Sequence, residues 1–454
     1  MLPSSSRNNS LESALTTTHP LLQPDILQIV FSYLTPVPDL CQAYQVCTTW
    51  AKVASTPLLW RHVIVVDPPT PFATAHKSPW PIIEPILTRP PRETRAAKRA
   101  RLSRSPLPQH NARGAKRAVH VISKRAGQLL QTLHLHRFCQ RVSDPDYLVS
   151  DEQLDDLANR CGPSLQQFSV INSRAEVAGW VSFAECCYNL KVLHIIACPT
   201  LRTGHIGPIL DFLPCLEDLS LRKCSQLRGI AFKIQLNSVR SSLKRIDISM
   251  TNISHIFIRE LALEFPRLEH FVANNCPSLT ISCRPFRLQH ERANMFPNLV
   301  NLQLNYIEYF SECWISLVSN HCPRLAALGA SVMDYGSLHS LFDEQAPPIE
   351  QLSLSGREVD DHLWQMIFEK VGSTLVHCDL SRTKTTCALT VHEGQQFSAL
   401  ESLNLSDTRA TDESVRKIIS IAPHLKHLKL TRCRGVKDRD FRRNPLRTTT
   451  SPKP

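Results

Sequence analysis

The chain has 454 residues, 42% of them hydrophobic, and a formal net charge of +12. This is enough for a sizeable core, or for about two to four domain-sized units. No run of about 18 uncharged apolar residues predicts a membrane span, and the N-terminus lacks the basic start and apolar stretch of a secretory signal.

The sixteen cysteines are scattered from Cys41 to Cys433, without a CxxC pair or a paired Cys/His set. We therefore expect no metal site, and reduced thiols in a cytosolic or nuclear protein. The sequence also lacks GxGxxG after a strand, GxxxxGK[ST], HExxH and GxSxG. No catalytic residue and no cofactor are predicted.

Residues 1–18 are predicted to be a disordered N-terminus and residues 19–62 a unit of three helices. Pro24 suits the first turn of a helix that is expected to run to Leu34, and Pro38 opens a second, short helix. A third helix is expected around Val46, Cys47, Trp50 and Val53. About forty residues rarely hold a core alone. They either pack on the rest of the chain or dock on a separate protein, and composition leaves both open.

The segment LLQPDILQIVFSYLTPVPDLCQAYQVCTTWAKVASTPLLW, residues 21–60, resembles an F-box. The family pattern is Leu-Pro-x-Glu-Ile-Leu-x-x-Ile-Phe-Ser-Tyr-Leu, followed by a Pro-x-Asp-Leu turn, Val-Cys-x-x-Trp and Leu-Trp. The matching residues are Leu22, Ile26, Leu27, Val30, Phe31, Ser32, Tyr33, Leu34, Pro36, Pro38, Asp39, Leu40, Val46, Cys47, Trp50, Leu59 and Trp60. Gln23 stands where the family has Pro, and Asp25 where it has Glu.

The resemblance implies that this segment docks the Skp-type adaptor of a cullin–RING (SCF) ubiquitin ligase. It would thereby explain why such a short unit carries so many apolar residues. The candidate adaptor-binding residues are Leu22, Pro24, Ile26, Leu27, Val30, Leu34, Leu40, Val46, Trp50, Leu59 and Trp60. Some of these must form the internal core of the segment, and the sequence does not sort them.

Residues 63–126 are rich in proline and charge and are predicted to be a disordered linker. Between Arg89 and Arg125, twelve Lys or Arg and one acid leave +11 of the net charge. Two clusters fit a short nuclear import signal, which a receptor binds as an extended strand: Lys98, Arg99 and Arg101, then Lys116 and Arg117. Nuclear and/or cytoplasmic localisation follows. The alternatives are a flexible tether and a nonspecific nucleic-acid-binding arm, although no aromatic residue is interleaved for stacking.

Residues 127–440 contain twelve copies of an L-x-x-L-x-L pattern, and residues 441–454 are predicted to be a disordered tail. The copies begin at Leu130, Leu165, Leu190, Leu216, Leu243, Leu268, Leu299, Leu325, Ile349, Leu375, Leu400 and Leu425. Most are 24 to 27 residues apart, and the two longer intervals of 35 and 31 residues indicate insertions. Such regularity predicts a repeat array in which each unit needs its neighbours to bury its apolar side.

Each unit reads as a strand followed, in most copies, by a helix, for example TDESVRKIISIAPHL with Thr411 or Asp412 as its cap. Strands stack about 4.8 Å apart and helices about 8–10 Å. Helices on one side therefore curve the array into a horseshoe whose concave face is lined by strands. The fold class is α/β, three F-box helices followed by about twelve repeats, and the array resembles the cysteine-containing leucine-rich repeats. The cysteines that follow strands are expected to pack inward as small hydrophobes: Cys198, Cys224, Cys276 and Cys433.

The outward positions of the strands supply a polar lining without a single sign of charge, which fits protein recognition better than nucleic acid. The candidate substrate-binding residues are His194, Asp218, Ser220, Arg222, Arg245, Asp247, His270, Asn305, Asp379, Asn404 and Lys429. An F-box followed by leucine-rich repeats resembles the non-catalytic substrate receptors of SCF ligases, which mark a protein target for proteasomal degradation. The alternative hypothesis is a repeat scaffold that acts outside ubiquitination, for instance in the nucleus.

Overall fold

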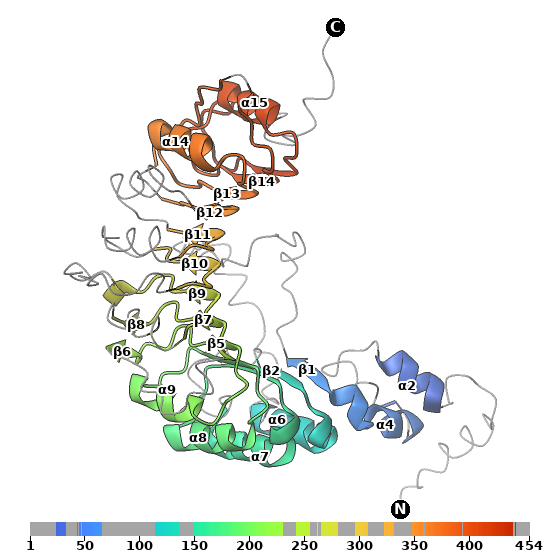
Figure 1. Cartoon of the computed structure of the whole chain (residues 1–454). Helices are drawn as coiled ribbons and strands as arrows, with labels where there is room; N and C mark the ends of the chain where they lie inside the picture. The colour runs from blue at the N-terminus through green and yellow to red at the C-terminus, as the bar shows by residue number, and fades with distance from the viewer. Residues whose placement is uncertain are drawn as a thin grey trace, which may run out of the picture.

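The computed structural model describes residues 24–32, 43, 45–46, 48–65, 114–135, 149–229, 242–254, 261, 265–279, 296–306, 322–330, 347–356, 359–392, 394–438 and 441. Within them, thirteen parallel strands form one continuous sheet that runs almost the whole length of the molecule (Figure 1). Helices such as α9 (Thr203–Leu210) lie to one side of the column of strands, and the two N-terminal helices lie at its β1 end.

Twelve of the thirteen strands begin two residues after the start of a predicted motif, which confirms the repeat assignment. They are β2 (Thr132–Leu135), β3 (Gln167–Ile171), β4 (Val192–Ile196), β5 (Asp218–Ser220), β7 (Arg245–Asp247), β9 (His270–Val272), β10 (Asn301–Gln303), β11 (Ala327–Gly329), β12 (Gln351–Ser353), β13 (His377–Asp379), β14 (Ser402–Asn404) and β15 (His427–Lys429). A second, two-stranded sheet pairs β6 (Arg228–Gly229) with β8 (Asn252–Ile253).

The thirteenth strand, β1 (His62–Val65), lies before the predicted array and pairs in parallel with β2. The carbonyl oxygen of Arg61 accepts hydrogen bonds from the amides of Gln131 and Thr132 at 2.8 and 3.1 Å. Gln131 repeats this pattern toward the next strand. The letters WRHVIV have the motif's spacing, and Trp60 and Val63 are fully buried like its leucines. The array therefore begins at Trp60, and the predicted boundaries at residues 62 and 127 are wrong.

Helices return the chain from one strand to the next. Their bounds are α6 (Gly114–Ala126), α7 (Asp151–Cys161), α8 (Val177–Cys186), α9, α14 (Asp361–Val371) and α15 (Asp412–Ile421), with 3-10 turns η4 (Gly127–Leu129), η7 (Gly162–Ser164) and η8 (Pro277–Leu279). Helix α6 lies inside the predicted disordered linker, so that prediction is wrong there. It is ordered because Val119, Ile122 and Ala126 fall on one face and are each about 1% exposed in the shared core.

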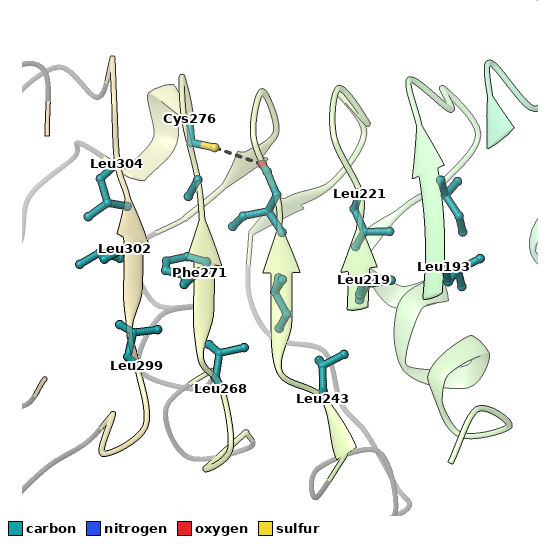
Figure 2. Packing of buried hydrophobic residues seen from close by; sticks show 14 of the residues in the cluster. Leu193, Leu219, Leu221, Leu243, Leu268, Phe271, Cys276, Leu299, Leu302 and Leu304 are labelled. Carbon is teal, nitrogen blue, oxygen red and sulfur yellow. Dashed lines mark hydrogen bonds between the residues drawn. The ribbon is translucent and has the colours of Figure 1, made fainter. Parts of the chain in front are cut away.

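The core is a set of stacked side-chain rows, one residue from each repeat (Figure 2). Leu219 and Leu221 point into it from β5 and its following residue, with exposures of 1% and 0%. Cys276 is also buried, and its Sγ donates a hydrogen bond of 3.2 Å to the carbonyl oxygen of Ile248 in the preceding repeat. Cys198, Cys224 and Cys433 are buried at the corresponding position. The expectation of inward, space-filling cysteines is confirmed.

Carboxylates at the starts of α14 and α15 tie their repeats to the next ones. Asp361 accepts hydrogen bonds from the backbone amides of Thr386 and Cys387 at 2.7 and 3.0 Å, and from the hydroxyls of Thr385 and Thr386 at 2.6 Å each. Asp412 likewise accepts from the amide of Lys437. The predicted cap of α15 is also present, since Thr411 Oγ1 accepts from the amide of Ser414 at 3.2 Å. These bonds satisfy backbone donors that would otherwise lie unpaired between helices.

A left-handed residue follows most strands, seven positions after the motif's first residue. These residues are Asn172, Ala197, Lys223, Met250, Asn275, Tyr306, Arg382, Asp407 and Arg432, with φ between 54° and 63°. Only Asn and Asp adopt this region readily among them, so the other six carry a steric cost of about 1–2 kcal/mol each. The turn geometry of the repeat, rather than the residue type, sets this conformation.

Candidate functional site

Two surfaces are candidates for binding, and the first belongs to the F-box-like segment. It comprises α2 (Pro24–Ser32), α4 (Thr48–Ala54) and the 3-10 turn η3 (Pro57–Trp60). Its inner side is sealed by side chains such as Leu27 and Phe31, both 1% exposed, and the ring of Phe31 meets that of Trp50 edge-on at 5.2 Å. Trp60 Nε1 donates to the carbonyl oxygen of Ala54 at 2.7 Å. This core continues without a break into the repeats.

Three large apolar side chains of the same segment are exposed to solvent. Val30 on α2 is 46% exposed, Val46 before α4 is 60% exposed, and Leu58 on η3 is 53% exposed. We call these three residues the F-box patch. The segment thus packs on the repeats through its buried side chains and also exposes large apolar groups, which is typical of a surface that a partner protein covers.

Of the predicted adaptor-binding residues, Leu27 and Trp60 are wrong, because both are core residues with 1% and 0% exposure. Val30 and Val46 are exposed as a contact requires, as is Pro24. Trp50 and Leu59 are partly buried and pack against the core. The side chain of Ile26 is not described, and Leu22, Leu34 and Leu40 lie outside the described residues.

Leu58 was not among the predicted contacts. The signal available was the run Pro-Leu-Leu-Trp at residues 57–60: with Trp60 turned into the core on a 3-10 turn, the leucine two positions earlier points elsewhere.

The second surface is formed by the outward positions of the strands, where charged side chains form rows across β4, β5 and β7. His194 Nε2 lies 3.4 Å from Asp218 Oδ1, and Arg245 Nε lies 3.7 Å from Asp218 Oδ2. Arg222 Nε lies 3.6 Å from Asp247 Oδ2. Burial raises the pKa of Asp247 above its usual 3.8, although the amide of Ser249 donates to its carboxylate at 2.9 Å. Basic and acidic side chains alternate, so this strand-lined surface has no single sign of charge.

Uncharged groups occupy the middle of the array. Asn305 Nδ2 donates to Gln303 Oε1 at 3.1 Å, and Gln303 Nε2 donates to Asn301 Oδ1 at 2.9 Å, which makes a chain of carboxamides along β10. Gly329 on β11 leaves room for this chain, because a Cβ there would collide with Gln303 Oε1. Beyond it, Asn404 Nδ2 donates to an Asp379 oxygen at 3.0 Å.

Two of the predicted substrate-binding residues are not available to a partner. Ser220 is 5% exposed because it lies directly between His194 and Asp247 in register, and Asn305 is 2% exposed beneath its bond to Gln303. Both predictions are wrong. The other nine predicted residues are at least partly exposed: His194, Asp218, Arg222, Arg245, Asp247, His270, Asp379, Asn404 and Lys429.

Most of the predicted import signal lies outside the described residues, at Lys98, Arg99 and Arg101. Lys116 and Arg117 lie in the first turns of α6. They are helical there, so the prediction of an extended strand is wrong for this second cluster.

The following statements apply to the residues that the structure describes. No group of three or more His, Cys, Asp or Glu side chains there is arranged to hold a metal ion. None of the helices in this part of the chain is long and apolar enough to cross a membrane. The eleven cysteines in this part of the chain are reduced thiols outside any disulfide, and Cys215 is exposed.

The family model described as F-box-like matches residues 24–65. F-box/LRR-repeat protein 5 of Salmo salar is 43% identical over 60 residues, which are 13% of this chain and 8% of that protein. The protein of the same name from Xenopus tropicalis is 49% identical over 45 residues, or 10% and 7%. The similarity thus spans less than a tenth of the length of these relatives.

Solved structures show a weaker likeness that extends over more of the chain. A chain in the crystal structure of the Rad7 and Elc1 complex in yeast aligns with 64% of this chain and 81% of its own length, at 14% identity and a TM-score of 0.39. An internalin (inlF) from Listeria monocytogenes aligns with 70% and 77%, at 13% identity and a TM-score of 0.37.

Proposed function

We propose that this chain, in which an F-box-like domain is followed by a leucine-rich-repeat array, is the substrate-recognition subunit of an SCF ubiquitin ligase. The F-box patch docks a Skp-type adaptor, which links the chain to cullin and RING subunits. The strand-lined face of the array binds a protein target for ubiquitination and proteasomal degradation. The chain itself is non-catalytic in this proposal, since ubiquitin transfer belongs to the other subunits.

The observation that supports adaptor docking is the division of the F-box-like segment into a sealed side and an open side. Leu27, Phe31 and Trp60 complete the core, whereas Val30, Val46 and Leu58 remain about half exposed. Exposed apolar side chains are stabilised when a partner removes them from water, by about 25 cal/mol for each Å² covered.

Adaptor docking is tested with a Val30→Asp/Val46→Asp double variant of the full chain, expressed in cells and purified by an affinity tag. Copurification of the Skp-type adaptor and of cullin should be lost, because each aspartate places a charge where an apolar contact forms. Lys52→Glu, at an exposed position of α4, is the matched control and should keep both partners. An adaptor retained by the double variant would refute the docking proposal. An unaltered chain that binds the adaptor without cullin would instead favour the non-ubiquitin scaffold.

The proposal for the target rests on the mixed charges of the strand-lined face. Arg222 and Arg245 are held near Asp247 and Asp218 at 3.6 and 3.7 Å, beyond hydrogen-bond distance, which leaves guanidinium donors for a partner's acceptors. Proximity labelling with the Val30→Asp/Val46→Asp chain should enrich targets that escape degradation. Adding Arg222→Glu and Arg245→Glu should remove those proteins. Deletion of the F-box is less suitable than the double variant for retaining targets, because deletion also removes Trp60 and exposes the end of the core.

Nuclear import is proposed for the basic cluster Lys98, Arg99 and Arg101 on the sequence alone. Alanine at all three positions should shift a fluorescently tagged chain from nucleus to cytoplasm. An unchanged distribution would leave the segment as a tether.

A further inference from the structure

The large apolar side chains that are exposed among the described residues lie toward one end of the molecule. The large ones are Val30, Val46, Leu58, Ile64, Leu129, Tyr188 and Phe212. Every one of them precedes β5, although described residues continue to position 441. Scattered exposed leucines are normal on any protein, but a one-sided concentration of this kind indicates a contact surface.

Four of these residues occupy the turns that lead into successive strands. Leu58, Leu129, Tyr188 and Phe212 are 53%, 47%, 48% and 39% exposed, and we call them the edge stripe. They precede β1, β2, β4 and β5, which are neighbours in the sheet apart from the intervening β3. The turn before β3 contributes an exposed proline, Pro163.

The turns before β1 to β4 lie side by side along one edge of the array. The turn η3 packs against η4, and η4 packs against η7. One repeat further, Asn189 Nδ2 donates a hydrogen bond of 2.8 Å to the carbonyl oxygen of Pro163, which joins the Tyr188 turn to η7. Strand spacing of about 4.8 Å then gives the stripe a length of roughly 20 Å from Leu58 to Phe212.

The residue immediately before the motif varies along the array. Leu129 is exposed there in the second repeat, whereas polar residues occupy this position in others, namely Ser164, Asn189, Arg267, Arg324 and His424. The repeat fold therefore accepts polar residues at this position, and an exposed leucine is not required by the turn itself.

We propose that the edge stripe is a second contact surface for the same Skp-type adaptor that docks on the F-box patch, an inference that rests on the proposed function. Leu58 belongs to both surfaces, since η3 is the last turn of the F-box-like segment and the first turn of the edge. A partner that covers Leu58 meets Leu129 next, and Tyr188 and Phe212 follow. Because β1 is paired to β2, both surfaces belong to one rigid unit.

Interface size supports a common occupant. A stable interface covers about 800 Å² on each partner, and the exposed side chains of the edge stripe add area to that of the F-box patch. Extension along the edge adds two aromatic residues, a class enriched among residues that dominate binding energy.

The test measures the affinity of the purified full chain for recombinant Skp-type adaptor by biolayer interferometry. A Tyr188→Glu/Phe212→Glu double variant should bind about tenfold more weakly, since the loss of two aromatic contacts typically reaches this size. Arg324→Glu, at an exposed position in the turn before β11, is the control and should change affinity less than about twofold. Thermal unfolding of each variant establishes that the array is intact.

The outcomes separate this inference from the proposed function. If Val30→Asp/Val46→Asp abolishes binding and the edge variant does not weaken it, the edge stripe is not an adaptor surface and adaptor docking stands. If Val30→Asp/Val46→Asp leaves binding intact, the proposed function itself fails. An edge variant that weakens only the complex containing cullin would assign the stripe to cullin and overturn the proposal. An edge variant that dissociates a dimer of the unbound chain, detected by light scattering, would assign it to a second copy and overturn it as well.

Discussion

The guanidinium carbon of Arg125 lies 4.8 Å above the centre of the Trp60 ring. Arg125 is at the end of α6 and Trp60 ends the F-box-like segment, so this contact crosses the 64 residues that separate the two positions in sequence. A cation over an indole face is stabilised by the negative potential of the ring. The first helix of the array thus covers the last aromatic residue of the F-box and joins the two parts.

Trp60→Ala is expected to destabilise the junction by about 3–5 kcal/mol, because it empties a fully buried site. Hydrogen exchange should accelerate in β1 and β2, which pair beside it, before it does so in β13 to β15. Arg125→Met keeps the aliphatic packing and removes the cation, so it should cost only about 1 kcal/mol. Equal exchange in both variants would show that Trp60 does not hold this junction.

Ala197→Gly is expected to raise the free energy of unfolding by about 0.5–1 kcal/mol. Ala197 has φ of 54°, and glycine removes a steric cost of about 1–2 kcal/mol while it adds about 0.4–1 kcal/mol of entropy to the unfolded chain. The amide that donates to the Arg222 carbonyl oxygen at 2.7 Å is retained. Thermal denaturation is the measurement. Ala178→Gly, an exposed position in α8, should shift the midpoint in the opposite direction.

Asp361→Asn should destabilise the C-terminal repeats by about 2 kcal/mol at pH 7, since four donors lose a charged acceptor. Burial raises the pKa of Asp361, but bonds from Thr385, Thr386 and Cys387 outweigh it and hold the pKa below 3.8. This stabilisation is therefore complete above pH 3.8 and disappears as the pH falls through the lowered native value. Urea unfolding should show a gap between the two proteins at pH 7 that shrinks at pH 3. Glu413→Gln, an exposed acid on α15, should show no gap at either pH.

Alkylation by iodoacetamide should distinguish the cysteines by position. Cys215 is exposed and should react within minutes in the folded chain. Burial raises the pKa of Cys276 to about 11 and that of Cys387 to about 12, so both lack thiolate as well as access. Mass spectrometry should find these two unmodified until denaturant is added. Early modification of Cys276 would contradict its inward orientation.

The strands of the array could be predicted because period-2 burial and a constant interval leave a signal in every copy. Leu219 and Leu221 alternate with polar residues in the sequence, and both are buried as expected. Strand β1 was not predicted, because Trp60 replaces the initial leucine of the motif and 69 residues separate it from Leu130. Helix α6 was not predicted for a related reason. The spacing of Val119 and Ile122 is helical, but the surrounding composition is that of a linker.

Residues at the candidate sites were harder to predict, since exposure depends on neighbours that are distant in sequence. Ser220 and Asp218 both occupy outward positions of β5, yet only Asp218 reaches solvent, because His194 and Asp247 flank the shorter side chain. In the F-box-like segment, Val30 and Leu27 are one helical turn apart and equally apolar. Which of them faces the core was decided by packing, a contribution that the hydrophobic pattern does not contain.

The pairing of β1 with β2 joins the F-box-like end to the sheet, so the strands set fixed distances along the molecule. Thirteen strands in unbroken succession connect the F-box-like end to the last repeat, so a target bound at any strand, as proposed above, would lie at a fixed distance from the proposed adaptor-docking end. Removal of one repeat would bring that target closer by one strand spacing, about 4.8 Å, and rotate it by the twist of one strand. A flexible connection would instead let its position vary. The number of repeats would then determine which lysines of a bound protein come within reach of a ligase.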